Sequence, residues 1–235
     1  RGGADVCRRC MEAVTGPGGR YGLIGPKCFA CARHCAAHRG RSDASGRACR
    51  CEVLTCFFVP VFETDGTKNA VHVQRLKDKV GNRSNASSEI EFHGAWGHRL
   101  GEPGRGVPTI LEMGTYTRLD CVIGTAGMMR EAVVQAIHHA RHRASFGAML
   151  VDHPLMQTVL ADLAIESEAA TALAMRLARA FDAADDTVDA AESLFRRLMT
   201  SASKFWVCKR GPELAAEAME VLGGNGYVEE NPLPR

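Results

Sequence analysis

Downstream of Pro108, apolar residues recur at intervals of three and four, the spacing that places side chains on one face of an α-helix. One such stripe comprises Met156, Leu160, Leu163, Ala170, Leu173, Leu177 and Phe181. A second comprises Val188, Ala191, Leu194, Phe195, Leu198, Ala202 and Phe205. With a further helix expected at about residues 108–143, the stripes predict long antiparallel helices that pack on one another or on a second subunit.

Local signals predict where these helices begin and end. Asp152 is suited to cap a helix that begins at His153-Pro154. Gly211 is expected to end the second striped helix, and Pro212 is expected to begin a last, shorter helix.

The last helix runs into the cluster Gly223-Gly224-Asn225-Gly226-Tyr227. Gly223 and Gly224 fit a left-handed helix stop, and Asn225-Gly226 adds a second tight turn. A Rossmann fingerprint requires its glycines after a strand and before a helix. Because these glycines follow a helix, we exclude that fingerprint.

Before residue 108 the pattern is that of strands separated by turn sequences. The expected strands cover residues 21–24, 54–62 with an interruption at Pro60, 71–76 and 89–92. Residues 33–50 fit neither period and are interpreted as a loop or a locally degraded stretch. We therefore predict an α+β fold: a partial antiparallel β domain over residues 1–107, followed by a long-helix antiparallel bundle over residues 108–235.

Composition and charge narrow the class of protein. The 235 residues are 46% hydrophobic, enough to bury a core, and the formal net charge is only +2. This charge is well short of that of a dedicated nucleic-acid binder. The longest apolar run, residues 54–62, is too short to cross a bilayer, and the first residues do not resemble a signal peptide. We expect a cytoplasmic protein without a membrane segment.

Eight of the ten cysteines fall between residues 7 and 56. They occur as Cys7-x-x-Cys10, Cys28-x-x-Cys31-x-x-x-Cys35 and Cys49-x-Cys51-x-x-x-x-Cys56. A CxxC turn can aim two thiolates at one zinc ion, so structural zinc is one interpretation. The intermediate spacings match no known zinc framework, and reduced thiols in a strand-rich region are the favoured alternative. We therefore assign no metal site.

Several motifs occur in a fixed order along the chain. They are Gly2-Gly3-Ala4-Asp5-Val6, Gly25-x-Lys27-x-Phe29, DKVGNRS at 78–84 leading to Glu91-Phe92, Arg143-x-x-Phe146-Gly147, Leu160-Ala161-Asp162 and the closing GGNGY. This series resembles the acyl-CoA dehydrogenase family. The stretches RLKDKVGNRSNASSEIEF, TRLDCVIG, HHARHRASFG, KFWVCKRG and AEAMEVLGGNGYVEE are similar to its alkylation-response (AidB-like) branch. The resemblance is close from about Phe57 onward and patchy before it.

The resemblance implies FAD bound between the β domain and the helical bundle, partly across a subunit interface of a homotetramer. By matching motif, Arg143 would meet the FAD pyrophosphate of a neighbouring subunit, and Phe146 would pack on the same cofactor. Gly223, Gly224 and Gly226 would let the backbone approach the cofactor closely. These residue types suit the task, because a guanidinium pairs bidentately with phosphate and only glycine permits such an approach. The resemblance also implies a fragment that lacks the family's N-terminal helical domain and final helices.

The resemblance leaves the catalytic residue unknown. Family chemistry uses a glutamate base to remove the α-proton of an acyl-CoA thioester while the flavin accepts the β-hydride. In most members this glutamate lies beyond the GGNGY segment. In the isovaleryl-type variant it precedes an arginine of the first bundle helix, where this chain has Thr117 before Arg118. Glu112 and Asp120 on the same helix are interpreted as surface or capping charges.

Two further positions depart from the family pattern. Cys28 stands where the family has a tryptophan beside the flavin, and Ala4 stands where it has a serine. A stacking surface and a hydroxyl group are both lost.

Three functional hypotheses follow. The first is an FAD-dependent, acyl-CoA dehydrogenase-like flavoprotein that is weak or inactive as this chain alone. The second is a DNA-associated, alkylation-damage-response protein in which flavin is mainly structural, with the basic cluster Arg130, His138, His139, Arg141, His142 and Arg143 insufficient by itself. The third is a cysteine-rich metal module fused to a helical bundle. We favour the first.

Overall fold

The computed structural model describes residues 11–16, 20–30, 35–40, 54–183, 189–228 and 230. The chain divides into two compact units, Arg1–Met113 and Gly114–Arg235. The division falls within the first turns of helix α1 (Gly106–His142). The domain boundary expected between residues 107 and 108 stays a prediction.

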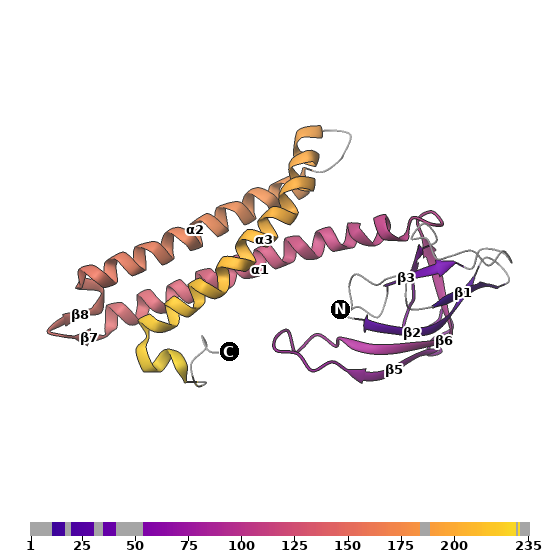
Figure 1. Cartoon of the computed structure of the whole chain (residues 1–235), viewed down its shortest axis with the longest axis horizontal. Coiled ribbons are helices and arrows are strands. Elements are labelled where there is room, and N and C mark those ends of the chain that lie inside the picture. The colour runs from indigo at the N-terminus through magenta and orange to yellow at the C-terminus, as the bar shows by residue number, and fades with distance from the viewer. Residues whose placement is uncertain are drawn as a thin grey trace. The chain divides into compact units, whose positions relative to one another are not determined.

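The first unit is a sheet that closes on itself (Figure 1). Its strands are β1 (Glu12–Thr15), β2 (Tyr21–Ala30), β3 (Cys35–Gly40), β4 (Leu54–Phe58), β5 (Val71–Leu76) and β6 (Ser88–Leu100). They follow the order β2-β1-β3-β4-β6-β5, and β2 also pairs with β6. All pairs are antiparallel except the short pairing of β1 with β3. The pairing of β2 with β6 closes five of the described strands into a ring, so each of the five has a partner on both sides, whereas an open sheet would leave its two edge strands with one side unpaired.

Strand β6 organises this unit because it pairs with β2, β4 and β5. Its buried residues alternate from Ser88 to Phe92 and then change phase at Ala95. The change occurs at Gly94, where the partner register shifts by one residue and φ is +77°. This is the geometry of a bulge. A strand expected only at residues 89–92 therefore extends to Leu100, because the bulge interrupts the alternation that strand prediction uses.

The other strand predictions had mixed outcomes. The strand at Val71–Leu76 is confirmed. The strand expected at 54–62 ends at Phe58, two residues before Pro60. Residues 35–40, interpreted as part of a loop, form β3 instead, and β1 was not predicted. Strand β3 pairs with β4 and β1, and β1 pairs with β2 across a short turn as well as with β3. These pairings, rather than the local residue pattern, make both segments strands.

Asn69 joins a loop to the sheet and is 2% exposed. Its amide nitrogen donates to the carbonyl groups of Pro60 and Trp96, both at 2.8 Å. Its amide oxygen accepts from the backbone N–H of Ala70 at 2.9 Å and of Trp96 at 2.8 Å. The side chain thus provides hydrogen-bond partners for backbone groups of the loop and of β6.

We predict that Asn69→Ala destabilises the first unit by about 2–4 kcal/mol, because it leaves several buried backbone groups without partners. Urea unfolding followed by circular dichroism measures this loss. The control is Gln74→Ala, which removes only an exposed hydrogen bond to Glu91. Equal stability of the two variants would contradict the role given to Asn69.

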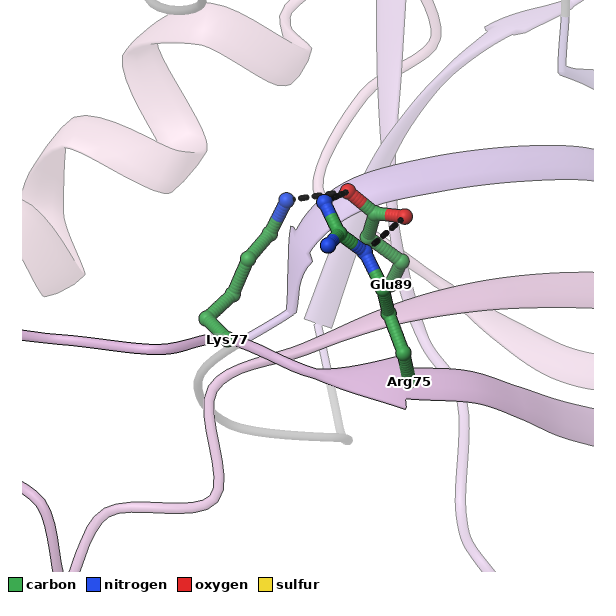
Figure 2. Close-up of polar contacts among 3 residues, drawn as sticks. All are labelled: Arg75, Lys77 and Glu89. Atoms are coloured by element: carbon green, nitrogen blue, oxygen red, sulfur yellow. Dashed lines mark hydrogen bonds and ion pairs between the residues drawn. The ribbon is translucent and has the colours of Figure 1, made fainter.

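Glu89 on β6 fixes the start of the loop that follows β5 (Figure 2). The Nε and Nη2 groups of Arg75 each donate to the Glu89 carboxylate at 3.0 Å, and Lys77 Nζ donates to the same carboxylate. The hydrogen bonds from Arg75 and then Lys77 lower the pKa of Glu89 from 4.5 to about 2. They do so because they stabilise the ionised form.

This shift predicts acid sensitivity. Between pH 4.5 and about 2, the unfolded chain binds a proton at Glu89 that the folded chain does not bind. Stability from this group is therefore complete above pH 4.5 and is lost as the pH falls towards 2. Glu89→Gln should flatten this part of the stability-against-pH curve, measured by urea midpoints at several pH values. Glu102→Gln, an exposed control on the same unit, should leave the slope unchanged.

The second unit contains most of α1 with α2 (Pro154–Asp182) and α3 (Ala190–Val221), as Figure 1 shows. A hairpin of β7 (Ala144–Ser145) and β8 (Ala148–Met149) and the 3₁₀ turn η3 (Leu150–Asp152) connect α1 to α2. The 3₁₀ turn η4 (Gly223–Tyr227) follows α3. The three helices share one core, in which Val133 of α1, Leu177 of α2 and Val207 of α3 are fully buried. Burying an apolar side chain of this kind stabilises the folded chain by about 1.5–3 kcal/mol. The predicted α+β fold class is confirmed.

The two predicted stripes had opposite outcomes. Residues of the first stripe, including Leu160, Leu163 and Leu177, lie in the core. Most of the described second stripe does not: Leu194, Leu198 and Phe205 are 55%, 62% and 66% exposed, while Phe195 is partly buried against the core. The face of α3 that is buried instead carries Thr200, Ser203, Val207, Gly211, Leu214, Ala218 and Val221.

The helix boundaries also required correction. Helix α3 continues through Gly211-Pro212, where a break was expected. Asp152 does not cap α2, because it lies in η3 and His153 is the N-cap residue without a side-chain cap bond. The start of α3 has a side-chain cap: Asp189 accepts from the backbone N–H of Ala191 and Glu192.

None of the helices in the described ranges is long and apolar enough to cross a bilayer. The cytoplasmic location expected from the sequence stays a prediction. Most of the cysteine-rich segment lies outside the described residues, and so does the zinc hypothesis that rests on it. The side chain of Cys56, which is described, is 1% exposed.

Candidate functional site

The hairpin after α1 presents an aromatic ring in a strained turn. Phe146 and Gly147 connect β7 to β8, and both have positive φ, at +53° and +83°. Two positive φ values match a type I′ turn, whose first central position favours asparagine, aspartate or glycine. A phenylalanine there costs on the order of 1 kcal/mol or more. Since Phe146 is also 96% exposed, its ring gains little packing within the chain to offset that cost.

Contacts on both sides hold the turn in place. The Nε2 atom of His153 lies 3.0 Å from the carbonyl oxygen of Ser145 and can donate to it in the appropriate tautomer. The ring of His153 meets that of Phe146 edge to face, with centroids 6.4 Å apart. The backbone N–H of Leu150 donates to the carbonyl of Arg143 at 2.9 Å. His153 was expected only to begin a helix, and its role in supporting the turn depends on an approach that the sequence does not show.

Arg143 lies between the end of α1 and the hairpin, and its side chain is exposed. Within the described part of the chain it forms no ion pair. His139, Arg141 and His142 occupy the last turn of α1, where positive charge interacts favourably with the helix dipole. Burial lowers the pKa of His139, and the charges of Arg143 and His138 lower it further. Burial and the neighbouring charges therefore both favour the neutral form of the His139 ring.

The three predicted site glycines have different roles in η4. Gly223 has φ +60°, so it provides the left-handed helix stop expected of it. A Cβ atom at Gly226 would lie 2.1 Å from the backbone oxygen of Met219, so the fold itself requires glycine there. A Cβ atom at Gly224 would meet nothing within 4 Å, and its φ is not positive. Gly224 is thus the glycine for which the described residues provide no structural reason.

Both parts of the candidate site lie at one end of the helical unit. Because α1 and α3 run antiparallel to α2, the hairpin after α1 and the turn after α3 are placed at the same end (Figure 1). An exposed guanidinium, an exposed aromatic ring and an open glycine backbone are a donor set that fits a dinucleotide with a pyrophosphate. The residues present therefore fit FAD.

The positions considered for a catalytic base provide no assignment. The Thr117 hydroxyl donates to the carbonyl of Gly114 at 2.9 Å within its own helix. Glu112 and Asp120 are exposed. The Lys27-Cys28-Phe29 segment lies on β2 where its register against β6 is irregular, and Ala4 is outside the described residues.

The surroundings of Gly226 and Gly224 predict different effects of an alanine substitution on stability. Gly226→Ala should destabilise the second unit by about 1–3 kcal/mol, because the backbone of Met219 must shift. Gly224→Ala should leave stability within about 0.5 kcal/mol of the parent. Thermal unfolding measures both, and a Gly226→Ala variant as stable as Gly224→Ala would contradict the close approach.

Comparison with known proteins places the chain in a family. The family model for the acyl-CoA dehydrogenase C-terminal domain matches residues 104–235. AidB of Escherichia coli is 48% identical over 235 residues, which cover 100% of this chain and 42% of AidB. Acyl-CoA dehydrogenase family member 11 of Caenorhabditis elegans is 29% identical over 240 residues, covering 100% of this chain and 39% of that protein.

A solved structure of a relative has the same fold over most of this chain. The crystal structure of Caenorhabditis elegans ACDH-11 in complex with C11-CoA matches 95% of this chain and 39% of that chain, with TM-score 0.86 and 28% identity. This chain thus spans about two fifths of the relatives described, at 42% and 39% of their lengths. Homologues in this family are FAD flavoproteins. From the matched domain and the AidB similarity, we conclude that the chain belongs to the acyl-CoA dehydrogenase family.

Proposed function

We propose that this protein is an FAD-dependent, acyl-CoA dehydrogenase-like flavoprotein, acting on the α,β-bond of an acyl-CoA thioester. The observation that carries the proposal is the hairpin turn, where Phe146 is 96% exposed with φ +53° beside the exposed Arg143. Strain at an exposed aromatic residue is typical of a position that serves a ligand. The similarity to ACDH-11, which was solved in complex with C11-CoA, supports an acyl-CoA substrate.

In this proposal each site residue has one task. Arg143 pairs with the pyrophosphate of FAD bound by a neighbouring subunit, since its guanidinium offers parallel N–H donors. Phe146 covers an apolar face of the same cofactor. Gly224, together with Gly223 and Gly226, allows the backbone to approach the cofactor. The flavin supplies a hydride acceptor when bound.

The chain by itself is proposed to be a weak or inactive dehydrogenase. Thr117 stands where the isovaleryl-type variant has its glutamate, and its hydroxyl is used within the helix. A threonine hydroxyl is a far weaker base than a carboxylate at neutral pH. Reduction of an electron acceptor with isovaleryl-CoA, at a rate near that of complete family members, would contradict this part of the proposal.

A homo-oligomer is part of the proposal, with a tetramer implied by the family resemblance. Leu194, Leu198 and Phe205 form an exposed apolar row on α3. Their spacing of four and seven residues places them on one face of the helix. A row of this kind favours burial against another chain.

The second candidate function is DNA association in the alkylation-damage response, with flavin mainly structural. The observation that favours it is the basic end of α1, where His138, His139, Arg141 and His142 gather beside Arg143. Binding to duplex DNA that weakens steeply with salt would support this function. Binding that is independent of salt would not.

We predict that the 235-residue chain, incubated with FAD and desalted, retains flavin as seen in its visible absorption spectrum. Arg143→Gln should reduce retained flavin about ten-fold or more, because the pyrophosphate loses a bidentate partner. Lys209→Gln, which removes one exposed charge from α3, should retain as much flavin as the parent. A colourless parent protein, or equal retention by both variants, would contradict the FAD assignment.

A further inference from the structure

Two cysteines of the helical unit lie on opposite sides of the contact between α1 and α3. Cys208 Sγ on α3 lies 3.7 Å from the carbonyl oxygen of Cys121 on α1 and 3.4 Å from the Thr125 hydroxyl. Neither cysteine is in a disulfide. The two residues are 87 positions apart in the chain, so they become neighbours only when the helices pack. This pair is distinct from the eight cysteines at residues 7–56, on which the zinc hypothesis rests.

The backbones of α1 and α3 approach each other closely at this contact. A Cβ atom at Gly211 would lie 2.6 Å from the methyl carbon of Thr125, so a larger residue does not fit there without a shift. Since each of these carbons is one or two bonds from its own Cα atom, the Cα atoms of Gly211 and Thr125 lie within about 7 Å of each other. That separation is about the largest that a disulfide spans.

Both cysteines lie about one turn before this close approach. Cys121 is four residues before Thr125 on α1, and Cys208 is three residues before Gly211 on α3. Each cysteine therefore shares a helix face with the residue that makes the contact. Because α1 and α3 both run antiparallel to α2, they run in the same direction, and the preceding turns of the two helices also meet (Figure 1).

The two thiols differ in exposure in a way that suits oxidation in two steps. Cys121 is exposed, whereas Cys208 is half-buried with its sulfur against α1. A dissolved oxidant reaches the exposed thiol first, and a second thiol beside it converts the product to a disulfide. Exposed side chains change rotamer within nanoseconds, so Cys121 Sγ can turn towards Cys208.

We propose that Cys121 and Cys208 form a disulfide between α1 and α3 of one chain when the protein meets a peroxide. The Cys121 thiolate attacks a peroxide oxygen: the S–O bond forms, the O–O bond breaks and hydroxide leaves, so the sulfur becomes a sulfenic acid. Cys208 Sγ then attacks this sulfur. The S–S bond forms, the S–O bond breaks, and the oxygen leaves as water with the proton of the Cys208 thiol. The peroxide accepts both electrons.

The bond acts as a reversible staple within the helical unit. It ties α1 to α3 ahead of the hairpin after α1 and of η4 after α3, the two parts of the candidate site, and it restricts the unfolded chain by closing a long loop. The inference goes beyond the proposed function and does not rest on it, because the reaction needs two thiols and a peroxide but neither FAD nor acyl-CoA.

The experiment treats the folded 235-residue chain with hydrogen peroxide at low protein concentration. The remaining thiols are alkylated, the monomer band of a non-reducing gel is digested with trypsin, and mass spectrometry detects peptide 119–130 joined to peptide 205–209. We expect this joined peptide in the monomer, and we expect dithiothreitol to separate it. Oxidation in urea should lower its yield about ten-fold or more, because the unfolded chain no longer holds the two thiols together.

Two variants assign the bond. Cys208→Ser should abolish the joined peptide. Cys56→Ser is the control: it removes a thiol that is 1% exposed in the first unit and should leave the yield unchanged. The proposal is overturned if the joined peptide is missing from the oxidised folded monomer, if its yield is the same in urea, or if it occurs only in cross-linked dimers.

Discussion

The close approach of α3 to α1 at Gly211 is the constraint on which the helical unit depends. A Cβ atom at this position would lie 2.6 Å from the side chain of Thr125. Nearby, Cys208 Sγ lies 3.4 Å from the Thr125 hydroxyl and donates to the Cys121 carbonyl at 3.7 Å. Since only a hydrogen atom fits at residue 211, the buried face of α3 is the one that carries small residues. Leu194, Leu198 and Phe205 lie outside this buried face and are exposed, where they can meet another chain.

The orientation of α3 that buries this face also places its arginines in two different surroundings. Near its start, Arg196 and Arg197 line a cavity without carboxylates. Further along, Arg210 pairs with Glu166 in a second cavity of about 210 Å³ that also contains Asp162, Glu213 and Glu217. Arg210 is therefore neutralised by its surroundings, and the hydrogen bonds to it lower the pKa of Glu166. Arg210 thus meets carboxylates of α2 and of its own helix, whereas the lining at the start of α3 contains arginines and hydroxyl-bearing residues.

The hairpin after α1 shows how stability and function compete locally. A residue such as asparagine or glycine would relieve the positive φ of Phe146, whereas Phe146 keeps a large ring exposed. His153 supports this turn from the start of α2, so the neighbouring helix contributes to holding the strained conformation. The sequence alone identified Phe146 and Arg143 through a family resemblance. The strain that makes Phe146 informative became visible only in the backbone.

Local pattern was sufficient to predict the α+β class, helices α1 and α2, strand β5 and the helix stop at Gly223, because each depends on side-chain periodicity or on one residue's φ preference. Tertiary structure decided the extent of β6 beyond the Gly94 bulge, the existence of β3, and the continuation of α3 through Pro212. It also decided which face of α3 is buried and which arginines surround a cavity. These features depend on contacts between segments distant in sequence, and such contacts can override local propensity because they bury more surface than any single residue preference can offset.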